Sequence, residues 1–117
     1  MKCGCGSGGK RLCQCDMMFV MDGSGSINKK EGAELVQFIK DVVTMLGDLG
    51  GHDIVYGSVV FATKAKVQTS LALQQDWQSF VNGVWLDRAN LGYTTQTHKG
   101  INLAVQELQN YGRNGTC

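Results

Sequence analysis

The chain contains no proline, no apolar run long enough to cross a membrane, and no concentration of charge of one sign. The net charge is +1, and the lysines and arginines are scattered rather than gathered into a stripe. This distribution predicts neither a nucleic-acid partner nor a dedicated polyanion partner. With 117 residues, 43% hydrophobic and 18% charged, the sequence is typical of one globular domain with its own core.

A secretory signal is also missing. Met1 is followed by polar and glycine-rich residues with no apolar core, so the sequence as given carries no secretory address. If the protein is extracellular, we expect its N-terminus to lie upstream of Met1.

Cysteine is unevenly distributed. The five cysteines are Cys3, Cys5, Cys13, Cys15 and Cys117. The first four form two Cys-x-Cys pairs, which could hold zinc or form disulfides in an oxidising compartment. Zinc sites usually space their cysteines Cys-x-x-Cys, and residues 114–116 form an acceptor sequon for N-glycosylation at Asn114. Disulfides are therefore favoured, and the odd count leaves one thiol unpaired or paired outside this chain.

Five apolar residues, 17–21, lead directly into Asp22-Gly23-Ser24-Gly25-Ser26. A continuous apolar run predicts a strand covered on both faces, as in parallel sheets. The carboxylate and both hydroxyls alternate with glycines, so a tight turn can gather their oxygens around one small hard cation. In a simpler interpretation, Asp22 and Ser26 cap the following helix and Ser24 is solvated.

The other patterns predict alternating helices and strands. Hydrophobic spacing predicts a helix over 29–46, with Gly47 as its C-cap, and a second strand over 54–61. Alternation over 65–71 predicts an antiparallel hairpin partner. A helix carrying Trp77 and Trp85 follows the N-cap Asp76, and we interpret both tryptophans as core packing.

A last helix, ended by Gly112, follows the hydroxyl-rich loop 91–97, and Ile101, Ala104, Val105 and Leu108 are predicted to share its face. Residues 1–14 show no periodicity and are expected to be a cysteine- and glycine-rich lead-in, with the domain itself over 15–117.

In this order, segments 19–27, 56–62 and 91–101 resemble a von Willebrand factor A domain, including the inserted domain of integrin α chains. The first segment is similar to the family's first strand with its Asp-x-Ser-x-Ser metal motif. The second is similar to its second strand, and the third to the loop that supplies a metal-binding threonine. The resemblance covers 15–112 and implies an α/β, Rossmann-like three-layer sandwich. Its sheet would be mainly parallel with one antiparallel edge strand.

Carried over by position, the resemblance implies the metal ligands Asp22, Ser24, Ser26 and Thr95, with Thr94 as the competing choice for the last. The implied cation is Mg²⁺ or Mn²⁺, ahead of Ca²⁺. The implied function is adhesion without catalysis, outside the cell or at its surface. A Glu or Asp of a matrix or cell-surface protein would complete the coordination shell of the cation.

One departure from the family lies at the end of the sequence. Family members continue into a strand that carries a second metal-site Asp, whereas this sequence stops at Cys117. We therefore expect a partial sheet in which strand 17–21 lacks a neighbour on one side. Such an edge favours self-association or poor cooperativity, and a sharp, concentration-independent thermal transition of a monomer would contradict that expectation.

Two other functions remain open from the residues. The domain could be a structural module of matrix assembly in which the metal is incidental, and partner binding that survives EDTA would favour this. Asp22 could also be the nucleophile of a Mg²⁺-dependent phosphoryl transfer. That chemistry needs a second carboxylate and a basic group, and no motif in the sequence places either of them beside Asp22.

Overall fold

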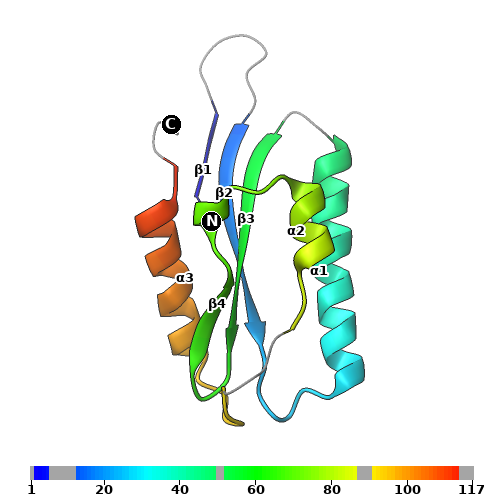
Figure 1. The fold of residues 1–117 in the computed structure, drawn as a ribbon, viewed down its shortest axis with the longest axis vertical. Helices are drawn as coiled ribbons and strands as arrows, with labels where there is room; N and C mark the ends of the chain where they lie inside the picture. Colours follow the sequence, from blue (N-terminus) through cyan, green and yellow to red (C-terminus); the bar gives the residue numbers. More distant parts are fainter. Residues whose placement is uncertain (1, 6–12, 50–51, 87–90, 114–117) are drawn as a thin grey trace.

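The structure is a computed structural model that describes residues 2–5, 13–49, 52–86 and 91–113. Its strands form one sheet in the order β1-β2-β3-β4. The strands are β1 (Lys2–Cys5), β2 (Cys13–Asp22), β3 (His52–Phe61) and β4 (Ala65–Thr69). The helices are α1 (Lys29–Leu49), α2 (Trp77–Gly83) and α3 (Thr97–Tyr111), with a 3-10 turn η1 (Leu71–Leu73). Helices α1 and α2 lie on one side of the sheet and α3 on the other, which gives three layers (Figure 1).

The centre of the sheet is the parallel pair β2–β3, which α1 connects. Asp22 at the end of β2 is in register with Phe61 at the end of β3. Met21, Val59 and Val60 are at most 1% exposed, because helices cover both faces of these strands. The continuous apolar run therefore predicted a doubly covered strand correctly, although β2 starts four residues earlier than the run.

The two outer pairings are antiparallel. The β3–β4 hairpin confirms the alternating pattern, but β4 ends at Thr69 because Leu71 turns into η1 and is buried there. The predicted α/β three-layer fold is confirmed, but strand β1 also pairs antiparallel with β2, so the sheet has a second antiparallel edge beside the predicted one. Residues 2–5 carry no strand-like pattern, so only their pairing with the backbone of β2 reveals the second edge.

Strand β1 covers only part of the edge of β2. It is in register with residues 13–16, and no other described residue pairs with 17–22 on that side. Val20 in this stretch is 37% exposed. Among the described residues, the edge of β2 is thus incompletely covered, as expected. Self-association through this edge stays a prediction.

Helix α1 continues two residues beyond Gly47, so the prediction that Gly47 ends the helix is wrong. An added Cβ at Gly47 would collide with the indole ring of Trp77. The glycine therefore lets α2 approach α1 closely. A sequence pattern alone cannot distinguish a glycine with this packing role from one that ends a helix.

Replacing Gly47 by Ala tests this packing. Alanine inside a helix normally stabilises by about 1 kcal/mol relative to glycine. Here we expect destabilisation by about 1–3 kcal/mol in urea unfolding, because the methyl group would overpack the Trp77 ring. Gly83→Ala is the matched control: nothing lies within 4 Å of the point that its Cβ would occupy, so it should be neutral or stabilising. An equal gain from both substitutions would contradict the account.

Helix α2 begins as predicted behind Asp76, which accepts a hydrogen bond of 2.8 Å from the Ser79 backbone N–H. This bond, with a further one to the Ser79 side chain, lowers the pKa of Asp76. The stabilisation that this hydrogen bond gives is present above the ordinary pKa and is lost as the pH falls through the lowered one.

The two tryptophans have different surroundings. Trp77 packs against the core, but Trp85 lies beyond the helix and is 56% exposed, so its interpretation as core packing is wrong.

Helix α3 ends at Gly112 as predicted, but it presents a different face to the sheet. Ala104 is buried, whereas Ile101 and Val105 are 50% and 42% exposed. The contact is instead made at Gly100, where an added Cβ would lie 2.7 Å from Cδ1 of Phe61. Because Gly100 has no side chain, α3 packs closely on the sheet along Gly100 and Ala104, and Ile101 and Val105 lie toward solvent.

Arg113, just after α3, ties the end of that helix to the sheet. Its Nε lies 2.9 Å from Oδ1 of Asp16, and its Nη1 lies 2.7 Å from Oδ2 of Asp53. Its Nη2 donates to the backbone oxygens of Cys15 and Asp53, each at 2.7 Å. Asp16 is only 1% exposed, so this arginine supplies the cation that a buried carboxylate needs.

Candidate metal-binding site

The loop after β2 gathers its oxygens by local hydrogen bonds. The Ser24 backbone N–H donates to Oδ1 of Asp22 at 2.8 Å, and the Oγ atoms of Ser24 and Ser26 lie 3.0 Å apart. The Gly23 N–H donates to the Phe61 carbonyl at 2.7 Å, which fixes the loop to the carboxyl end of β3. Ser24 is fully buried, whereas Ser26 lies nearer the surface. One carboxylate and two hydroxyls thus converge between the core and solvent.

These side chains do not cap α1. Asn28 does so: its Oδ1 accepts from the Glu31 backbone N–H at 2.8 Å, and Oε1 of Glu31 accepts from the Asn28 backbone N–H at 3.3 Å. This is a reciprocal capping box. The simpler interpretation, with Asp22 and Ser26 as caps, is therefore wrong, and the loop's oxygens remain available for another purpose.

The hydroxyl-rich loop 91–97 lies directly beside the loop that follows β2. The Gly25 N–H donates to the Tyr93 carbonyl at 3.0 Å, and the Gln96 N–H donates to the Ala62 carbonyl at 2.9 Å. A side chain added at Gly25 would meet the Tyr93 ring, so glycine is needed for this close approach. Segments about seventy residues apart in the sequence are therefore brought into contact at one end of the sheet.

Thr63 holds the hydroxyl-rich loop in place, and no sequence pattern singles this residue out. Its Oγ1 lies 2.6 Å from the Thr94 hydroxyl and accepts from the Thr94 backbone N–H at 3.1 Å. Its carbonyl accepts from Nζ of Lys99 at 2.8 Å. A threonine in a strand turn carries no sequence signal for such contacts, because its partners lie more than thirty residues away.

The two candidate threonines differ in their surroundings. The Thr94 hydroxyl is engaged by Thr63. Thr95 is exposed, and its side chain makes no hydrogen bond to any described residue.

The donor set is made of oxygens and carries little charge. In the part of the chain that the structure describes, no three His, Cys, Asp or Glu side chains are grouped as a metal site would require. A cation here would depend on Asp22 together with serine and threonine hydroxyls. Hard ions such as Mg²⁺ and Mn²⁺ accept this donor type, whereas thiophilic ions prefer sulfur and imidazole.

The remaining predicted sites are only partly described. Cys15 is one half of a disulfide. Asn114, Cys117 and the side chains of Cys3, Cys5 and Cys13 lie outside the described residues. Among the helices that are described, none combines the length and apolarity needed to span a membrane.

The comparison with protein families decides the identity of the fold. Residues 16–115 match the von Willebrand factor type A domain model. The chain belongs to this family. Domains of the family are protein-binding modules, so a general adhesion or protein-binding role follows from membership. No curated protein sequence matches the chain.

Solved structures share this von Willebrand factor A fold. Proximal thread matrix protein 1 from the mussel byssus has a TM-score of 0.63 at 22% identity, over 80% of this chain and 25% of that one. A structure of the same protein with a zinc-occupied MIDAS motif has a TM-score of 0.65 at 21% identity, over 88% and 26%. An uncharacterized membrane-spanning protein from Vibrio fischeri has a TM-score of 0.59 at 21% identity, over 82% and 50%. The chain therefore spans between a quarter and a half of these proteins.

Proposed function

We propose that this domain is a divalent-cation-dependent adhesion or protein-binding module. Asp22, Ser24, Ser26 and Thr95 would hold the cation, and a Glu or Asp of a protein partner would complete its shell. Mg²⁺ is the proposed ion, with Mn²⁺ as a close substitute and Ca²⁺ as a weaker one, because the donors are few, small and oxygen-based. The zinc in the MIDAS motif of the mussel protein supports a divalent cation at this kind of motif.

The observation that carries this proposal is the arrangement of the loop after β2. The buried Ser24 hydroxyl and the Asp22 carboxylate are prepositioned, while Asn28 rather than either of them caps the helix. With one carboxylate among the donors, a bound cation would keep most of its positive charge. It would therefore attract an external carboxylate more strongly than an ion in an all-carboxylate cage.

The cellular setting is part of the same proposal. We place the domain outside the cell or at its surface, with residues 15–117 as the domain body and 1–14 as an N-terminal addition. The disulfide at Cys15, the sequon at Asn114 and the likeness to a thread matrix protein of the byssus support this placement. The other cysteines are proposed to form disulfides and Asn114 to be glycosylated. The proposed activity is binding, without catalysis.

A calorimetric titration with MgCl₂ and MnCl₂ tests the proposed site. We expect saturable heat at one equivalent for each ion, a weaker response to CaCl₂, and loss of the bound ion to EDTA. No heat with either ion would sink the proposal. Binding of a protein partner that survives EDTA would favour a structural matrix module instead.

Thr63 is expected to act as a positioning residue for this site. In Thr63→Val, the hydroxyl that holds Thr94 is lost, so the threonine loop should loosen and Mn²⁺ affinity should fall about 10–100-fold. Thr63→Ser keeps the hydroxyl and should restore most of the affinity. If serine and valine weaken binding equally, or neither does, Thr63 has no positioning role. Calorimetry on all three proteins makes the comparison.

A further inference from the structure

A groove beside α1 plays no part in the metal loop, and its lining is unusual in charge. It has a volume of about 660 Å³ and runs between α1 and the segment that follows α2. The lining residues are Lys29, Gly32, Ala33, Val36, Gln37, Lys40, Trp85 and Leu86. A volume of this size falls in the range of ligand-binding clefts.

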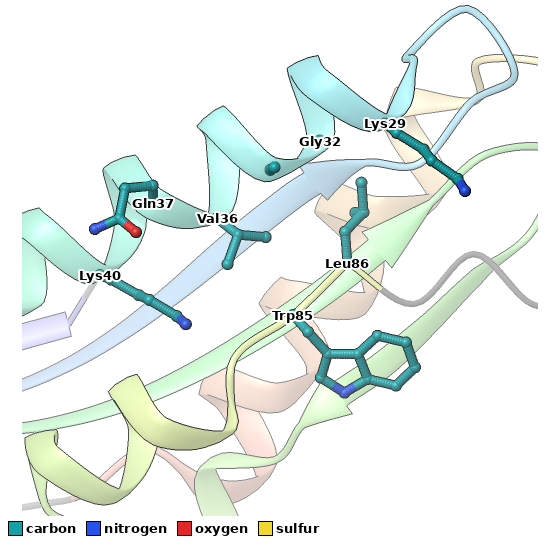
Figure 2. A pocket seen from close by; sticks show the side chains of 8 residues that line it. Lys29, Gly32, Val36, Gln37, Lys40, Trp85 and Leu86 are labelled. Atoms are coloured by element: carbon teal, nitrogen blue, oxygen red, sulfur yellow. The ribbon is translucent and has the colours of Figure 1, made fainter.

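The floor and walls of the groove are apolar. Val36 and Leu86 pack against the core from the two sides, and Gly32 is buried, which keeps the α1 wall shallow. Figure 2 shows the α1 side chains on one side and Leu86 and Trp85 on the other. Trp85 is 56% exposed here, in a position where an aromatic ring can cover the chain of a bound peptide.

Both ends of the groove are positively charged. The lining contains Lys29 and Lys40 but no Asp or Glu. Neither lysine forms an ion pair with any residue that the structure describes. Asp41 does not line the groove, and its carboxylate accepts from the Gln37 amide at 2.8 Å rather than from either lysine.

We propose that this groove binds a short, extended acidic peptide segment of a protein partner. Lys29 and Lys40 are eleven residues apart, or about 16 Å along the helix axis. An extended chain advances about 3.3 Å per residue, so carboxylates about five residues apart meet both lysines. Apolar side chains between them fit over Val36, Leu86 and Trp85. The groove is thus a second contact surface, which needs no metal.

A synthetic peptide, acetyl-Glu-Thr-Val-Leu-Thr-Glu-amide with a fluorescent label, is the probe. Its binding is measured by anisotropy in EDTA, with the full chain. We expect saturable binding that weakens at least about fivefold in Lys29→Gln/Lys40→Gln and in Trp85→Ala. The charge-matched control Lys30→Gln/Lys64→Gln removes two exposed lysines outside the groove and should leave binding unchanged.

The outcomes separate this proposal from the metal site. Binding that appears only with Mg²⁺, or that is lost in Asp22→Ala, assigns the peptide to the metal loop and overturns the groove. Equal binding of a peptide with both Glu replaced by Gln, or equal loss in both double variants, overturns the charge argument. No binding at millimolar peptide overturns the whole proposal. Circular dichroism confirms that each variant is folded.

Discussion

Arg113→Ala should destabilise the domain by about 3–5 kcal/mol, which is the usual result of removing one partner of a buried ion pair. Asp16 is 1% exposed, and its carboxylate accepts from both the backbone N–H and Nε of Arg113, at 2.7 and 2.9 Å. Without the guanidinium, the buried carboxylate loses its cation, and two backbone oxygens lose a donor. Urea unfolding should show a large fall in the midpoint, with a fall in Tm of more than about 10 °C.

Asp53 provides the matched comparison. It contacts the same arginine at 2.7 Å, but its side chain is 46% exposed. Water can replace this partner, so Asp53→Asn should cost no more than about 1 kcal/mol. If the two substitutions have similar effects, Arg113 is not holding a buried charge. The contrast also tests whether Arg113, which follows α3, stabilises the sheet through Asp16.

Asp22→Ala should abolish the calorimetric signal for Mg²⁺ and Mn²⁺. Asp22 supplies the only carboxylate among the proposed ligands, and the remaining donors are neutral hydroxyls. Neutral oxygens alone compensate poorly for the dehydration of a small divalent ion. The fold should survive, because Asp22 lies at the very end of β2, and circular dichroism would confirm this.

Asp41→Ala is the control for this substitution. Asp41 is exposed on α1 and is engaged only by the Gln37 amide among the described hydrogen bonds, so its loss should not alter metal binding. An equal heat in the wild-type protein and in Asp22→Ala would show that the ion binds elsewhere. A generic phosphate ester assayed with the same proteins addresses the enzymatic alternative. Turnover lost in Asp22→Asn would revive it.

The sequence predicts the central part of this fold because the signals there are local. The apolar run before Asp22, the cap at Asp76 and the end of α3 at Gly112 each depend on neighbouring residues. The Asp-x-Ser-x-Ser motif and the threonine loop could likewise be identified, and the contact from Gly25 to Tyr93 brings them together.

What could not be predicted depends on contacts between distant residues. Gly47 is a packing contact with Trp77 rather than a helix end, and Gly100 rotates α3 so that Ile101 and Val105 face outward. The contacts of Thr63 and the antiparallel pairing of β1 span at least eight residues and leave no periodic pattern in the sequence. These features follow only from the three-dimensional arrangement.

The most direct test of the proposed cation site is a titration of the ¹⁵N-labelled chain with substoichiometric Mn²⁺, followed by NMR. A paramagnetic ion held by this site should broaden the amide signals of 22–26 and 93–97 first, and excess Mg²⁺ should restore them. Broadening centred on another part of the chain, or no selective broadening in either loop, would contradict the account.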